Sequence, residues 1–176
     1  MRCFVFGTGR CGTAAVAVAF AHATNFTAAH ESFCSLAWYP DGHIEVNPQL
    51  RVRMGDIIRN HPEALYVWLL RDCDLVAASY DRLDRGNWLD KWWSFAPSVR
   101  PTNRREAARI AVDRLLAQCQ DAYAACPPDR RLMVDIASPA EWFPALWAAL
   151  GCEGDLTAAL ASFGTPVNTS AQRGDA

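Results

Sequence analysis

The sequence predicts an α/β protein, a three-layer sandwich with a central parallel sheet and helices on both faces of that sheet. Short apolar runs, suited to strands that are buried on both faces, alternate along the chain with longer segments suited to helices. A glycine-rich turn follows the first run, and charged side chains follow later ones. This alternation is typical of parallel sheets that carry a helix layer on each side.

The first half of the chain contains two of the expected strands. The first strand is expected at 2–6, and an Ala/Val-rich helix, apolar nearly all round, at 12–24. A second strand is expected at 26–30, and the Pro-Asp-Gly at 40–42 indicates a turn. A helix at 48–60 ends before an Asn-His-Pro sequence, because proline disfavours helical geometry in the residue before it.

The second half begins with the most apolar run. Residues 64–70 are apolar throughout, as a doubly covered strand requires, and a helix is expected at 74–80. A long amphipathic helix is expected at 103–125, capped by a polar residue at its start. The last clear strand is expected at 131–136, and Ser138-Pro139 opens a further helix.

Length and composition indicate one domain. The 176-residue chain is 51% hydrophobic, which is enough for a single core. We expect this domain to span 1–168 and a loose C-terminal tail to span 169–176. The net charge of −2 provides no overall basic field, so we expect no nucleic-acid partner and no membrane partner. The first apolar run leads straight into a glycine turn, unlike a signal peptide, and no run is long enough to span a bilayer.

Cysteine usage favours a cytoplasmic protein. The chain has seven cysteines, and none forms a Cys-x-x-Cys pair or a Cys/His cluster with zinc spacing. An odd number in a chain that is large enough to form its own core favours reduced thiols. We therefore expect a cytoplasmic location and no metal cofactor, while the oligomeric state does not follow from the sequence.

The segment from Gly7 to Thr13 is expected to bind an anion. Its glycines let the backbone bend sharply and approach a ligand closely. The unpaired N–H groups at the start of the following helix attract phosphate or sulfate oxygens, and Arg10 adds a full positive charge. Ligands of parallel sheets bind at the carboxyl ends of the strands. We therefore expect this loop, His30-Glu31 and Arg71-Asp72 to line one cleft.

The glycine pattern alone fits more than one ligand. Gly7-x-Gly9-x-x-Gly12 matches the pattern of dinucleotide-binding oxidoreductases, and Glu31 lies at about the distance, ~20 residues, at which an acid holds the ribose. The first and last glycines also have the spacing of an NTPase phosphate loop. However, Thr13 stands where that loop has its phosphate-binding lysine, which disfavours ordinary ATP chemistry. A nucleotide-binding module without catalysis is a further alternative.

Two motifs together resemble those of the sulfotransferases. Arg10-Cys11-Gly12-Thr13 resembles that family's 5′-phosphosulfate loop, in which a basic and a small residue precede Gly and then Ser or Thr. The family's second motif is an Arg-Asp at the end of the third strand, with a Ser eight residues after the Arg and near an aromatic residue. Here it is Arg71-Asp72 with Ser79-Tyr80. The resemblance covers about the first half of the chain. It departs from the family in Ala14, where many members have a second Thr, and in the short chain length.

The resemblance implies a P-loop-like sulfotransferase fold and a donor site. The donor of the family is 3′-phosphoadenosine 5′-phosphosulfate (PAPS), from which a sulfuryl group passes to a hydroxyl or amine of a small-molecule or glycan acceptor without a metal. By resemblance, the donor-binding residues are Gly9, Arg10, Cys11, Gly12, Thr13, Arg71 and Ser79. The loop would hold the 5′-phosphosulfate, where Arg10 would also balance charge on the leaving oxygen. Arg71 and Ser79 would bind the 3′-phosphate.

The resemblance also implies a general base after the second strand. The family places an acid or a histidine there, so Glu31 and His30 are both candidates. We favour Glu31, because neighbouring residues at a strand end point in opposite directions and we expect one of them to face the cleft. Together with Arg10, these two residues are the expected catalytic groups.

Overall fold

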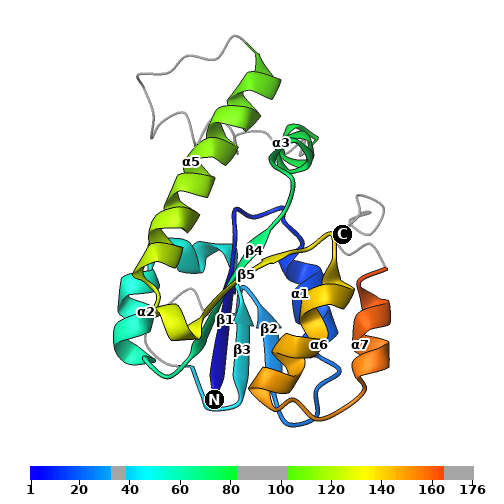
Figure 1. The fold of residues 1–176 in the computed structure, drawn as a ribbon. Helices are drawn as coiled ribbons and strands as arrows, with labels where there is room; N and C mark the ends of the chain where they lie inside the picture. Colours follow the sequence, from blue (N-terminus) through cyan, green and yellow to red (C-terminus); the bar gives the residue numbers. More distant parts are fainter. Residues whose placement is uncertain (33–38, 83–102, 165–176) are drawn as a thin grey trace.

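Five parallel strands form one sheet in the order β2-β3-β1-β4-β5, with helices on both of its faces (Figure 1). The computed structural model describes residues 1–32, 39–82 and 103–164. The strands are β1 (Arg2–Phe6), β2 (Thr27–His30), β3 (His43–Val46), β4 (Leu65–Leu70) and β5 (Arg131–Asp135). The helices are α1 (Thr13–Phe20), the 3₁₀ helix η1 (Pro48–Val52), α2 (Met54–Asn60), α3 (Cys73–Asp81), α5 (Arg104–Ala125), the 3₁₀ helix η2 (Pro128–Arg130), α6 (Pro139–Leu150) and α7 (Leu156–Ser162). The predicted α/β class is confirmed, and the predicted tail at 169–176 lies outside the described residues.

One face of the sheet is covered by α1, α6 and α7. Phe20, at the end of α1, packs against Phe143 and Trp147 of α6, with ring centroids 4.8 and 6.2 Å away. Aromatic pairs of this kind contribute about 0.5–1.5 kcal/mol each beyond their burial. These contacts fix α1 against α6. They also fix the position of the glycine loop, which leads into the N-terminus of α1.

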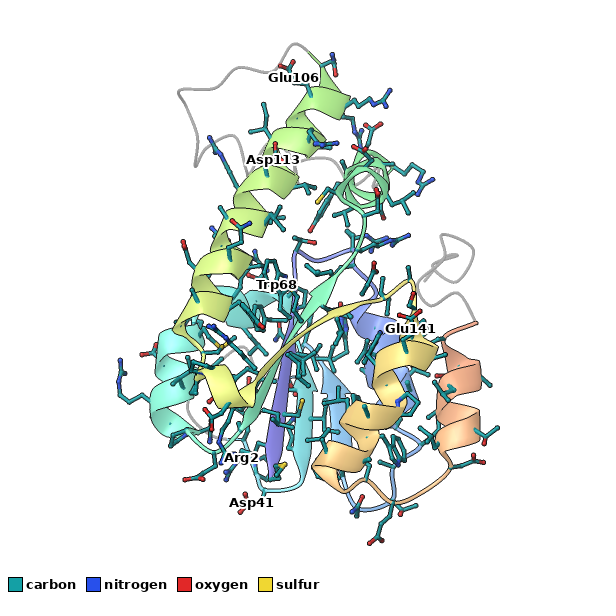
Figure 2. The ribbon with its side chains drawn as sticks, viewed as in Figure 1. Arg2, Asp41, Trp68, Glu106, Asp113 and Glu141 are labelled. Carbon is teal, nitrogen blue, oxygen red and sulfur yellow. The ribbon has the colours of Figure 1, made fainter. Side chains whose placement is uncertain are left out.

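The other face is covered by η1, α2 and α5. Figure 2 shows Trp68 of β4 between the sheet and α5, where its ring lies 5.5 Å from that of Tyr123. The 22-residue α5 extends past the carboxyl edge of the sheet, and Val112 and Leu115 there pack with Val76 and Tyr80 of α3. As a result α3 is held above the carboxyl ends of the strands.

The strand β3 was not predicted. It is short and carries two ionisable residues, His43 and Glu45, which do not fit the apolar pattern of a covered strand. All four of its residues are nevertheless buried. The polar side chains are satisfied by hydrogen bonds from neighbouring segments, so burial of this strand does not leave unpaired groups in the core.

Several helices differ from the prediction. The first helix ends at Phe20 rather than 24, and Ala23 instead forms an isolated bridge with Gly154. The helix expected at 48–60 is two pieces, because the backbone at Arg53 turns to φ −123° between them. The helix α7 was not predicted. None of the helices in the described ranges is long and apolar enough to cross a bilayer.

The sheet order places the glycine loop at a switch point. The neighbours of β1 are β3 and β4, so the chain leaves β1 in one direction and later returns on its other side. Ligands of open α/β sheets bind at such points. In the dinucleotide-binding order 3-2-1-4-5-6 the second strand lies beside the first. Here β3 lies between them, which differs from that order.

Candidate functional site

The loop between β1 and α1 has the backbone geometry of an anion cradle. Gly9 and Gly12 have φ of 77° and 95°, and Arg10 between them also has a positive φ, 56°. A Cβ built on Gly12 would lie 2.7 Å from Cγ1 of Ile136, so only glycine fits there. Gly12 is also the N-cap of α1, and no side chain caps that helix in the described structure. The first N–H groups of α1 are therefore available to a ligand anion.

The loop is held from α3 by a tyrosine. The hydroxyl of Tyr80 donates to the carbonyl oxygen of Thr8 over 2.8 Å. Burial raises the pKa of Tyr80, which keeps this hydroxyl protonated and able to donate. A Cβ on Gly9 would lie 2.6 Å from the same hydroxyl, so the glycine allows the close approach of α3.

Cys11 contributes backbone rather than side chain to the loop. The residue is fully buried, and its sulfur lies 2.5 Å from the position that a Cβ on Gly7 would occupy. Burial raises the pKa of the Cys11 thiol, so it is not a reactive thiolate. Of the predicted loop residues, Cys11 therefore presents only main-chain atoms to a ligand.

Two arginines and a serine meet beside the loop. Arg10 donates from Nε to Oγ of Ser79 over 3.1 Å, which joins the loop to α3. Arg71, at the end of β4, donates from Nη1 to the carbonyl oxygen of Arg10 over 2.9 Å. The structure thus brings together the three residues that sequence analysis assigned to two anion subsites. Both guanidinium groups lie at the same edge of the sheet as the helix N-terminus.

The two acids near Arg71 interact with other groups: one caps α3 and the other links α3 to α5. Asp72 is the N-cap of α3 and accepts from the N–H of Leu75 over 2.9 Å. Asp74 forms an ion pair with Arg109 of α5. Within the described part of the chain, neither acid pairs with Arg71.

The two base candidates lie together at the end of β2. Nε2 of His30 and Oγ1 of Thr13 share a hydrogen bond of 3.0 Å. A carboxylate oxygen of Glu31 lies 3.9 Å from the same nitrogen, and the Glu31 side chain is 51% exposed. The two side chains therefore lie near each other instead of pointing in opposite directions. Glu31 has left the extended conformation, with φ 54°, and this turns its side chain to the same side as His30.

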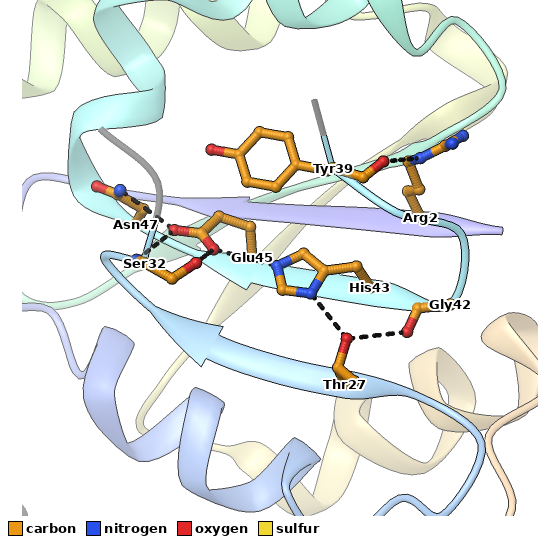
Figure 3. A network of polar contacts seen from close by, with 8 residues as sticks. All are labelled: Arg2, Thr27, Ser32, Tyr39, Gly42, His43, Glu45 and Asn47. Carbon is orange, nitrogen blue, oxygen red and sulfur yellow. Dashed lines mark hydrogen bonds and ion pairs between the residues drawn. The ribbon is translucent and has the colours of Figure 1, made fainter. Parts of the chain in front are cut away.

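A buried carboxylate fixes the turn that follows β2 (Figure 3). Glu45 of β3 is fully buried and accepts from the backbone N–H and the hydroxyl of Ser32, over 3.0 and 2.5 Å. Nε2 of His43 and Nδ2 of Asn47 lie 3.2 and 3.3 Å from its oxygens. Burial alone would raise the pKa of Glu45, but the hydrogen bonds from these three residues outweigh it and lower the pKa. Glu45 is therefore ionised, and it anchors the residue directly after Glu31.

Sequence analysis missed the groups that support the site. Tyr80 was noted only as an aromatic residue beside Ser79, and Glu45 was not assigned a role. A charged residue between apolar positions, as in His43-Ile44-Glu45-Val46, was the available signal for a satisfied buried carboxylate. In the described residues no group of three or more His, Cys, Asp or Glu side chains is placed to hold a metal ion.

Comparison with known proteins identifies the fold. No protein-family model matches the chain, and no curated protein matches it in sequence. The chain is similar in structure to a solved protein described as "Sulfotransferase Domain from the Curacin Biosynthetic Pathway", with a TM-score of 0.67 and 11% sequence identity. The match covers 93% of this chain and 78% of that one. This likeness shows that the chain has a sulfotransferase-like α/β fold.

Proposed function

We propose that this protein is a sulfotransferase that moves a sulfuryl group from PAPS to a hydroxyl or amine of an acceptor. The observation that carries the proposal is the junction of Arg10, Arg71 and Ser79 beside an uncapped helix N-terminus. PAPS carries one anionic group at each side of its ribose, at the 3′ and the 5′ position. A protein that binds it needs two cationic subsites close together, and few other nucleotides need both.

The residues fit the donor group by group. The N–H groups at the start of α1 and the hydroxyl of Thr13 are suited to the oxygens of a 5′-phosphosulfate. Arg10 is anchored in the loop and reaches Ser79, so its guanidinium lies between the two subsites. Arg71 and Ser79 supply a planar donor fork and a hydroxyl for a 3′-phosphate. The likeness of the fold to a sulfotransferase domain supports this assignment.

In the proposed reaction, Glu31 takes the proton from the acceptor hydroxyl or amine. The acceptor atom then forms a bond to sulfur while the bond from sulfur to the bridging phosphate oxygen breaks. Arg10 and the α1 N–H groups stabilise the negative charge that grows on that oxygen. The products are the sulfated acceptor and adenosine 3′,5′-bisphosphate. We assign the base to Glu31 because Nε2 of His30 is already bonded to Thr13, whereas the Glu31 carboxylate is half exposed.

The order of the strands argues against the oxidoreductase alternative. In the dinucleotide-binding order, the acid that holds the ribose follows the strand next to β1. In this protein Glu31 follows β2, which is the edge strand. Thr13 in place of a lysine argues against an ATP-dependent enzyme.

Calorimetric titration with adenosine 3′,5′-bisphosphate tests the proposal, with NADH, NADPH and Mg-ATP titrated alongside. We expect the bisphosphate to bind at least about tenfold more tightly than the other three, because only it engages both subsites. Tight NADH or NADPH binding without bisphosphate binding would establish a dinucleotide site instead. If the bisphosphate binds but no acceptor is sulfated in a screen with PAPS, the protein is a nucleotide-binding module without catalysis.

A further inference from the structure

A buried arginine lies on η1, the short helix next to the glycine loop. Arg51 is on η1, which directly follows β3, the strand beside β1. The residue is only 6% exposed. Its Nε donates to Oε1 of Gln118 over 2.9 Å, and its Nη1 donates to the carbonyl oxygen of Pro48. Both acceptors are neutral, and the guanidinium stays protonated at any ordinary pH.

Within the part of the chain that the structure describes, no acid is paired with this charge. In the described ranges, no Asp or Glu carboxylate forms an ion pair with Arg51, and its two hydrogen-bond acceptors carry no charge. Burial lowers the pKa of Arg51, and the ionisable groups that act on it are Cys119, Tyr80 and Cys11. Burial raises the pKa of each of these three groups, so they are neutral as well. A buried charge without a counter-ion is unfavourable for folding. An anionic ligand nearby would supply the missing opposite charge.

The arginine is coupled to the loop through η1. The N–H of Asn47, just before η1, donates to the carbonyl oxygen of Val5 over 2.9 Å, which ties η1 to the end of β1. A Cβ built on Gly9 would lie 3.8 Å from Cβ of Pro48, so η1 lies next to the loop. The carbonyl oxygen of this same Pro48 accepts from Arg51. The helix η1 therefore links the guanidinium of Arg51 to the loop.

We propose that Arg51 is a third cationic residue of the anion site, which acts on a 5′-phosphate group through the loop without touching it. This inference rests on the proposed function for the identity of the ligand. Arg51 is a positioning and electrostatic residue, and its guanidinium bonds to α5 and η1 instead of to the ligand. The field of a buried charge is weakly screened. The effect of Arg51 on binding should therefore increase with the negative charge of the ligand and decrease as that charge lies farther from the loop.

The test compares three probes of different charge. We would titrate 5′-AMP, 3′-AMP and uncharged adenosine into the wild type, Arg51→Gln and Arg51→Lys. At an effective dielectric constant of ~20, two opposite unit charges that are ~10 Å apart attract each other by enough to alter binding about tenfold. We expect Arg51→Gln to weaken the binding of 5′-AMP by about that factor and the binding of 3′-AMP by less. The affinity for adenosine should stay within twofold of the wild type. Arg51→Lys keeps the charge and should stay within about threefold for 5′-AMP.

Arg53→Gln is the matched control. This neighbouring arginine is 46% exposed and pairs with Asp56, so its removal should leave all three affinities unchanged. Arg51→Met is a second neutral variant in case Arg51→Gln does not fold, and circular dichroism with a urea midpoint reports folding of each. An equal loss for adenosine and 5′-AMP would assign Arg51 to packing and overturn the inference. So would an unchanged affinity for 5′-AMP. If the wild type itself binds neither 5′-AMP nor the bisphosphate, the proposed function fails and takes this inference with it.

Discussion

Replacing Glu45 by glutamine removes one buried negative charge and almost no volume. The wild-type carboxylate accepts four hydrogen bonds, two of them from Ser32 and the others from His43 and Asn47. Glutamine retains one acceptor oxygen and turns an NH₂ group toward donors that already point inward. Hydrogen bonds to charged groups contribute about 1.5–3 kcal/mol each, and a buried donor left unpaired costs a similar amount. We therefore expect Glu45→Gln to lower the free energy of unfolding by about 2–3 kcal/mol at neutral pH.

The loss should depend on pH in a defined direction. The pKa of Glu45 is lowered in the fold, so the folded state favours the ionised form. The resulting stabilisation is fully present above the pKa of the unfolded chain, near 4.5, and it is lost as the pH falls through the lower pKa of the folded state. The difference between wild type and variant should therefore be constant above about pH 5.5 and should shrink below pH 4.5.

Urea unfolding from pH 3.5 to 7.5 measures this difference, with Glu63→Gln as the control. Glu63 is exposed, and its replacement should change stability by less than about 0.5 kcal/mol. A difference for Glu45→Gln that does not vary with pH would mean that the carboxylate is not ionised in the fold. A difference near zero at pH 7 would mean that the network does not stabilise the turn after β2. Either result would refute the account of Glu45.

Two further substitutions test the loop and the base. Gly12→Ala should lower the free energy of unfolding by about 2–5 kcal/mol, because alanine is strained at a positive φ and its Cβ would clash with Ile136. The control Gly55→Ala, at a helix position with open space around it, should not destabilise the protein. Urea unfolding of both variants measures the difference. Glu31→Gln should leave binding of adenosine 3′,5′-bisphosphate within twofold and lower sulfuryl transfer by about 10²–10⁴-fold, and retained transfer would move the base to His30.

The local parts of the fold and the site were predictable from sequence. The loop glycines, the apolar strands β1 and β4, and the Arg71–Ser79 spacing depend on residues that are neighbours in the chain or about two helix turns apart. Their geometry follows from backbone sterics and from burial on both faces of the sheet.

The remaining features depend on partners that are distant in sequence. β3 can be buried only because Ser32 and Asn47 satisfy Glu45, which no periodicity in residues 43–46 reveals. The orientation of Glu31 depends on a positive φ that is held from β3, so the rule of alternating strand residues fails there. Arg51 has the sequence context of an ordinary helix arginine, and only the packing of η1 beside α5 makes it a buried charge.

The central claim is that the glycine loop and the end of β4 bind one ligand through two separate phosphates. Calorimetry on Arg71→Ala with adenosine 3′,5′-bisphosphate and with 5′-AMP tests it most directly. We predict a loss of about 10–100-fold for the bisphosphate, from the missing charge-assisted bonds to its 3′-phosphate. For 5′-AMP we predict at most about threefold, from the lost contact to the Arg10 carbonyl. Equal losses for the two ligands would contradict the claim, because Arg71 would then support the loop and bind no second phosphate.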